Sequence, residues 1–181
     1  MTVQTQDDAA AGNQAATRRE MLLLLPDLRG FARFLVRDRV AADDLVQDTV
    51  VQALGALGQF QSGTNLKAWL FTILRNQFFA QARRRKREAE LLQANFQPEQ
   101  ASVSGDDLAD LGDLQRMLWT LSPLLREALV LVGAQELSYD EAAAICAVPV
   151  GTVKARVSRA RAALARVMDD RSAQPGVSVH L

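Results

Sequence analysis

The sequence has very little of the two residue types that cross-link proteins or bind transition metals. Cys146 is its only cysteine and His180 its only histidine. A single thiol excludes a disulfide within the chain, and one cysteine with one histidine is too few ligands for a Cys/His zinc site. We therefore expect no structural disulfide, no bound metal and no cofactor.

Segments that would direct the chain into or across a membrane are also lacking. The apolar run at residues 21–25 is far too short to span a bilayer. Residues 1–20 are polar and rich in Ala and Gln, without the basic start and apolar run of a signal peptide. These features predict a cytoplasmic protein.

Net charge is zero, but the two signs are separated along the chain. Residues 21–87 carry 11 Lys and Arg against 5 Asp and Glu, and residues 114–168 carry 7 against 4. Between them, residues 88–113 carry 7 acidic residues and no basic one. Two basic blocks around an acidic one predict two modules joined by a connector, each module with phosphate as a candidate partner.

Apolar residues recur at helical spacing almost throughout, and no segment alternates as a strand does. The predicted fold class is all-α, with two small helical domains at residues 21–87 and 114–168. Residues 88–113, which include Pro98 and Gly105, indicate a flexible acidic linker, and residues 1–20 and 169–181 indicate disordered tails. Helices are expected over residues 26–36, 43–58, 65–87, 114–121, 123–132, 139–146 and 150–168.

The last two predicted helices have the order of a helix-turn-helix. Ser138 and Glu141 have the spacing of a capping box, so a short helix begins there, and a tight turn at residues 147–149 leads into a longer basic helix. On that helix an apolar stripe is expected to be buried, formed by Val153, Val157, Ala160 and Leu164.

Other side chains of the last helix point away from that stripe. Thr152, Ala155, Ser158 and Arg159 would face outward, where they could reach base edges in a DNA groove. Lys154, Arg156 and Arg161 would flank them and meet phosphates. The pattern by itself also fits a solvated amphipathic helix.

The segment LSYDEAAAICAVPVGTVKARVSRARAAL, residues 137–164, resembles the promoter-reading C-terminal region of extracytoplasmic-function sigma factors. Sigma factors are subunits that carry RNA polymerase to promoters. The resemblance implies that the last helix enters the −35 element, with contacts from Thr152, Lys154, Ala155, Arg156, Ser158 and Arg159.

The sequence departs from the family pattern at two positions: Ala155 replaces a common serine, and Ala147 stands where the turn usually has glycine. If Ala147 must adopt a positive φ, alanine costs on the order of 1 kcal/mol there.

Two segments of the first module resemble the N-terminal core region of the same family. They are ADDLVQDTVVQAL, residues 42–54, and TNLKAWLFTILRNQ, residues 64–77. The resemblance implies that one helix face docks on the clamp helices of the polymerase's largest subunit, through Asp44, Leu45, Gln47, Asp48 and Val51. Without the resemblance, the same face fits a solvated surface.

The resemblance also implies a site for the −10 element. Asn76 and the loop formed by Phe60, Gln61 and Ser62 would hold a base flipped out of the non-template strand. The basic residues Arg83, Arg84 and Arg85 would lie along backbone phosphates. Trp69, near this site, equally fits core packing, and the basic run equally fits a solvated helix end.

These features predict a sigma factor that binds core RNA polymerase, recognises the −35 and −10 elements and helps to melt DNA, without being an enzyme. The segments GTNLKAWLFTILRN and EALVLVGA are similar to the alphaproteobacterial general-stress branch of the family. That similarity implies stress-response promoters and an anti-sigma partner. The acidic linker fits either simple solvation or a nucleic-acid mimic that threads polymerase channels.

Three other functions are less compatible with the sequence. A sigma-mimicking protein that sequesters an anti-sigma factor needs no basic recognition helix, yet Arg156, Arg159 and Arg161 are present. A ligand-responsive repressor would need an effector or dimerisation domain in place of residues 21–87. An enzyme would need a phosphate loop, a nucleophile motif or a ligand cluster.

Overall fold

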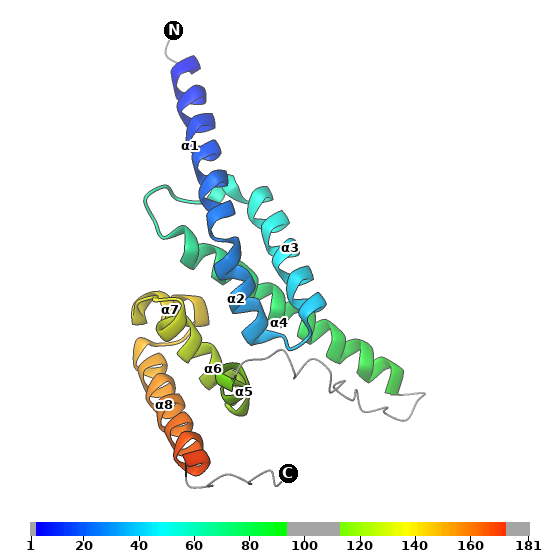
Figure 1. Ribbon diagram of the computed structural model, residues 1–181. Helices are drawn as coiled ribbons and strands as arrows, with labels where there is room; N and C mark the ends of the chain where they lie inside the picture. The colour runs from blue at the N-terminus through cyan, green and yellow to red at the C-terminus, as the bar shows by residue number, and fades with distance from the viewer. Residues whose placement is uncertain (1–2, 94–112, 173–181) are drawn as a thin grey trace, which may run out of the picture.

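The computed structural model describes residues 3–93 and 113–172, and within these ranges every regular element is helical (Figure 1). The predicted all-α class is therefore confirmed. The elements are α1 (Val3–Leu23), α2 (Leu25–Leu35), α3 (Arg39–Gly55), η1 (Leu57–Gln59), α4 (Leu66–Gln93), α5 (Asp113–Thr120), α6 (Pro123–Leu129), the π-helical η3 (Val130–Ala134), α7 (Tyr139–Cys146) and α8 (Val150–Ser172).

The first module is built from α2, α3 and α4. Pro26 lies in the first turn of α2, as predicted, where its missing N–H costs no hydrogen bond. Asp38 caps α3 by accepting a hydrogen bond from the amide of Ala41 at 2.6 Å. The fully buried rings of Phe31 and Phe71 stack with centroids 4.8 Å apart and join α2 to α4 in the core.

The second module contains α5 to α8. Ser138 and Glu141 form the predicted capping box at the start of α7. The predicted stripe on α8 is confirmed, because Val153, Val157 and Ala160 are at most 1% exposed and Leu164 packs against the same core. The helix-turn-helix is therefore held by its own apolar contacts.

The N-terminal segment differs from the prediction of a disordered tail. Residues 3–23 form α1, whose C-terminal part is anchored by the buried side chains of Thr17 and Met21. Near the middle of α1, the side-chain amide of Asn13 donates a hydrogen bond to the hydroxyl of Ser62. Ala and Gln are good helix formers, so anchoring one end is enough to extend the helix away from the core.

Two helices, α4 and α8, are longer than predicted. α4 continues to Gln93, with the i,i+4 ion pairs Arg84–Glu88 and Lys86–Glu90 along its last turns. α8 continues to Ser172. The remaining linker residues, 94–112, and the tail residues 173–181 lie outside the described part of the chain, and so does their predicted disorder.

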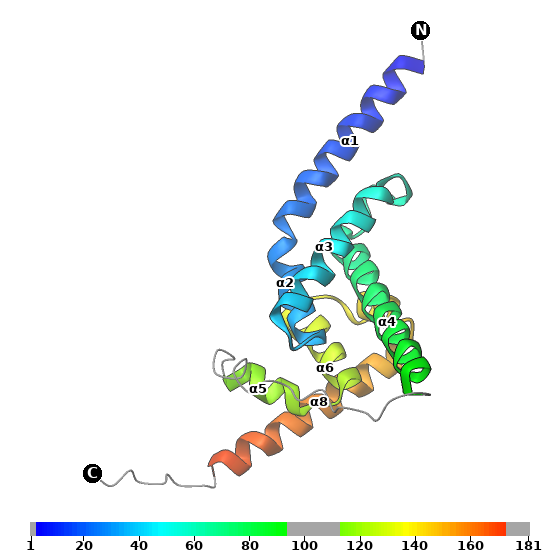
Figure 2. The same cartoon turned by 90° about the vertical axis from the view of Figure 1, so that its right-hand side faces the viewer.

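The two modules are in contact. α7 packs against α4, and α6 packs against α2. Figure 2 shows α6 lying beside α2 and α4, with α8 on the far side of α6.

Ala147 adopts a positive φ, the backbone conformation that is strained for alanine. It ends α7 with φ 53° and ψ 47°, in the left-handed region. Its side chain is exposed, so we expect Ala147→Gly to raise the free energy of unfolding by up to about 1 kcal/mol. Urea denaturation of both proteins would measure this, with the exposed, right-handed Ala144→Gly as the control that should destabilise. A less stable Ala147→Gly protein would show that the strain is negligible.

Candidate nucleic-acid and protein interfaces

One face of α3 is exposed along its whole length. Asp44, Gln47 and Asp48 are exposed, and Val51, about one turn after Asp48, is 70% exposed. Val40 (69%) and Leu54 (44%) continue the same face. These two residues are not among the predicted docking residues, although positions 40, 44, 47, 51 and 54 follow the heptad-like spacing of one helix face.

Leu45 corrects the predicted docking set. Its side chain is 1% exposed and belongs to the core, as does Thr49 one turn later, whose hydroxyl donates to the Leu45 carbonyl at 2.7 Å. At 100° per residue, Leu45 falls on the opposite side of α3 from Val40 and Val51. Leu45 therefore anchors α3 to the core of the first module and cannot touch a partner on the exposed face.

Polar contacts tie the exposed face of α3 to α4. The amide of Gln77 donates to the Asp48 carbonyl at 3.0 Å and to the Gln52 side chain at 2.7 Å. The amide of Gln81 donates to the Asp48 carboxylate at 3.2 Å. These bonds hold α3 in register on α4, so that its exposed side chains are presented on a fixed surface.

The predicted −10 loop lies between η1 and α4. Gln61 and Ser62 are exposed at its tip, where Gly63 turns the chain with φ 87°. The ring of Phe60 packs on Trp69 with centroids 5.2 Å apart. Trp69 itself is half-buried against the core, so it serves as the support of this loop.

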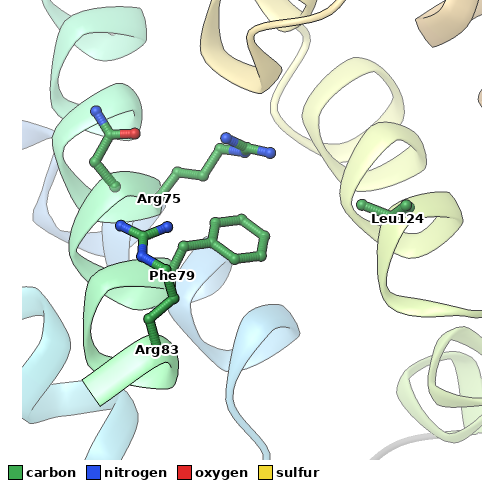
Figure 3. A pocket seen from close by; sticks show the side chains of 5 residues that line it. Arg75, Phe79, Arg83 and Leu124 are labelled. Atoms are coloured by element: carbon green, nitrogen blue, oxygen red, sulfur yellow. The ribbon is translucent and has the colours of Figure 1, made fainter. Parts of the chain in front are cut away.

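Asn76 is exposed on α4, but the structure does not bring it together with the loop. It lies seven residues beyond Trp69, a rise of about 10 Å along the helix. Its neighbours are instead Arg75, Phe79 and Arg83, which line a pocket between α4 and Leu124 of α6. Figure 3 shows Arg75 and Phe79 extending from α4 toward α6.

The basic residues at the end of α4 are all exposed. Arg83 lines the pocket beside Asn76, whereas Arg84 is paired with Glu88 at 2.7 Å. The hydrogen bond from Arg84 to Glu88 raises the pKa of the guanidinium. Arg83 and Arg85 are exposed cations on the last turns of α4.

The predicted −35 residues occupy different positions on α8. Ser158 and Arg159 are exposed, whereas Thr152 and Ala155 are half-buried. Lys154 is exposed with its ammonium 5.8 Å from the centre of the Tyr139 ring on α7. Of the four residues predicted to face outward, Ser158 and Arg159 are accessible, and so is Lys154, which was predicted to flank them.

Arg156 departs from the predicted phosphate contact. Its Nη1 atom is buried and has no hydrogen-bond partner within the described part of the chain. It lies near Cys146, where burial and the charge of Glu127 raise the thiol pKa to about 12 while Arg75 and Arg156 oppose that rise. In this structure part of the Arg156 guanidinium is therefore buried, close enough to Cys146 of α7 to affect its thiol.

Within residues 3–93 and 113–172, no group of His, Cys, Asp and Glu side chains is arranged to hold a metal ion. No helix in these ranges is long and apolar enough to cross a membrane.

Two family matches coincide with the two modules. Sigma-70 region 2 matches residues 22–88, and sigma-70 region 4 matches residues 111–164. The chain is 43% identical over 152 residues to the ECF RNA polymerase sigma factor EcfG of Rhodopseudomonas palustris, covering 83% of this chain and 84% of that protein. It is 36% identical to the ECF RNA polymerase sigma factor SigC of Mycobacterium tuberculosis, covering 86% and 85%.

Among solved structures, the chain is similar to the sigma factor RpoE of Bartonella quintana in complex with the anti-sigma factor NepR. The TM-score is 0.71 at 44% identity, over 84% of this chain and 96% of that one. A second similar structure is CnrH in complex with the cytosolic domain of CnrY, with a TM-score of 0.67 at 29% identity over 91% and 94%. The EcfG and RpoE matches agree with the general-stress branch indicated by the sequence. With both sigma-70 regions matched in order, the chain belongs to the extracytoplasmic-function sigma factors, which direct RNA polymerase to promoters.

Proposed function

We propose that the exposed face of α3 is the surface by which this sigma factor docks on the clamp helices of the polymerase's largest subunit. The observation that carries this proposal is the exposure of Val40, Val51 and Leu54 between acidic and amide side chains. Neighbouring exposed apolar side chains such as Val51 and Leu54 can mark a protein interaction site. A mixed apolar and acidic surface suits a non-obligate protein interface.

The −35 element is read by the exposed side chains of α8. Arg159 has the length and the planar donors for a bidentate contact with guanine, and Ser158 lies one residue before it on the outer face. Lys154 lies near the start of the helix, where a cation meets backbone phosphate. Ala155 has no hydrogen-bonding group and contributes shape alone.

Arg159→Ala and Lys154→Ala separate these two roles. We expect Arg159→Ala to weaken promoter binding by about 1–3 kcal/mol and to relax the preference at one or two −35 positions. Lys154→Ala should weaken all sequences alike and flatten the dependence of affinity on salt. Fluorescence anisotropy with a set of single-base −35 duplexes would measure both. Equal, sequence-independent losses would show that Arg159 is one more phosphate contact.

The −10 element is assigned to two parts of the first module. The loop of Phe60, Gln61 and Ser62 presents an aromatic ring and two polar side chains near the N-terminus of α4. Asn76 and Arg83 lie further along α4, with Arg85 on the outer turns. Because about 10 Å of helix separates Asn76 from Trp69, we assign the loop and Asn76 to different nucleotides of the melted strand.

The chain supplies recognition and DNA melting, while nucleotide addition belongs to the polymerase, so we assign it no enzymatic activity. The action on promoters places it in the cytoplasm. The Bartonella quintana relative was solved with an anti-sigma factor, and an anti-sigma partner is proposed here on the same basis. Transcription in vitro with core polymerase on a genomic promoter library tests the function and identifies the promoters in one experiment, and no specific transcripts would refute it.

A further inference from the structure

The helix α1 lies mostly ahead of the part of the chain that matches the family. Sigma-70 region 2 matches residues 22–88, whereas α1 spans Val3–Leu23. Its C-terminal part packs on α2 and α4, where the side chains of Thr17 and Met21 are 8% and 3% exposed. From this anchor α1 extends past the other helices toward the N-terminus (Figure 2). The turns next to the anchor are therefore held in fixed positions outside the core.

Asn13 lies one turn before the buried Thr17. The hydroxyl of Thr17 donates to the Asn13 carbonyl at 3.0 Å, within the helical turn that joins the two residues. The exposed side-chain amide of Asn13 donates to the hydroxyl of Ser62, 49 residues further along the chain. Ser62 is at the tip of the loop between η1 and α4. A side chain from outside the matched region therefore contacts the predicted −10 loop.

Contacts within the first module hold the two ends of this loop. At its start, the ring of Phe60 packs on Trp69 with centroids 5.2 Å apart. At its end, the amide and the hydroxyl of Thr64 both donate to the Gln61 carbonyl, at 3.1 and 2.7 Å, and close a tight turn. The bond from Asn13 adds a third point of attachment at the exposed tip, where the polar side chains that would meet DNA are located.

We propose that α1 positions the −10 loop, with Asn13 as the positioning residue for Ser62. Because the Asn13 amide donates this bond, the Ser62 hydroxyl keeps its own proton for a bond to DNA. A nucleotide is bound more tightly when the loop conformation that it needs is already populated. One hydrogen bond shifts such an equilibrium by about 2- to 10-fold. The consequence for the −10 element rests on the proposed function, but the fixing of the loop tip does not.

The fixing of the loop tip is tested by its mobility in the free protein. A nitroxide label on Gln61→Cys reports the motion of the exposed tip by electron spin resonance. The native Cys146 is buried, and burial raises its pKa to about 12, so it reacts poorly with the label. Adding Asn13→Ala should make the label more mobile, because the bond to the tip is lost. Gln14→Ala, at the next exposed position of α1, is the matched control that should leave the spectrum unchanged.

The consequence for DNA is measured in the unlabelled protein by abortive transcription with core polymerase. The templates are mismatched across the melted region and carry each base in turn at the −10 positions. Asn13→Ala should lower the preference for the native −10 bases by about 2- to 10-fold, while binding of a −35 duplex and capture by core polymerase stay unchanged. Asn13→Gln keeps the amide donor and should retain most of the preference. In a Ser62→Ala protein, Asn13→Ala should have no further effect, because its partner is already absent.

The outcomes separate the positioning role from the proposed function. Unchanged mobility of the tip in Asn13→Ala would overturn the positioning role, and so would an Asn13→Ala effect of equal size with and without the Ser62 hydroxyl. A loss of base preference in Ser62→Ala that Asn13→Ala does not share would also overturn it. If Asn13→Ala frees the tip but neither variant changes the base preference, α1 still fixes the loop, and the assignment of the loop to the −10 element is refuted instead.

Discussion

Co-purification with core RNA polymerase should be lost when Asp48→Arg and Val51→Asp are combined in one protein. Val51 is 70% exposed on α3, and its burial under a partner stabilises the complex by roughly 1.5–3 kcal/mol. Introducing a carboxylate there adds the cost of desolvating a charge, and reversing Asp48 removes any complementary pairing. Together these changes should weaken the complex by more than about 100-fold.

The double variant should remain folded, because neither side chain belongs to the core. Asp48 loses only the exposed 3.2 Å hydrogen bond from Gln81. A matched control places the same kinds of charge change on exposed positions of α8, Ala165→Asp and Asp169→Arg. Affinity capture with tagged core polymerase, together with far-ultraviolet circular dichroism, gives both readouts. Normal capture of a well-folded Asp48→Arg/Val51→Asp protein would remove the exposed face of α3 as the docking surface.

Asn76→Ala should sharply reduce open-complex formation while leaving −35 binding unchanged. Asn76 is exposed on α4, and a base contact from its side chain forms only after the base has left the duplex. Losing one such contact costs about 1–3 kcal/mol, or about 5- to 150-fold in the formation of the open complex. Permanganate footprinting and abortive transcription on a fully paired promoter would measure this loss.

A template that is already mismatched across the melted region distinguishes an effect on base recognition from an effect on DNA melting. On it, Asn76→Ala should recover part of its activity, because the unstacking cost is already met, while its preference for the native −10 base stays weakened. Glu90→Ala, at another exposed position of α4, is the control that should behave like the unchanged protein. Normal opening with full base preference in Asn76→Ala would leave −10 reading to Phe60, Gln61 and Ser62 alone.

The sequence by itself determined the helices from α2 onward and many of their ends, but not α1. Helical period and capping depend on residues three or four positions apart, so the pattern is local and can be read directly from the chain. The capping box of Ser138 and Glu141 predicted the start of α7, and Pro26 predicted the first turn of α2. The helical period of 3.6 residues predicted the buried stripe of α8. The two sigma-70 regions were recognisable for the same reason, because their motifs are contiguous segments.

Only the tertiary structure decided which side chains of those helices are accessible. Leu45 lies within the family motif, but its neighbours in the first module bury it. Arg156 has a sequence position typical of a phosphate contact, yet its Nη1 is buried in the folded chain. The pair of Arg75 and Glu127 spans 52 residues of the chain. No local pattern specifies such a contact, since it depends on how two separately recognisable modules pack against each other.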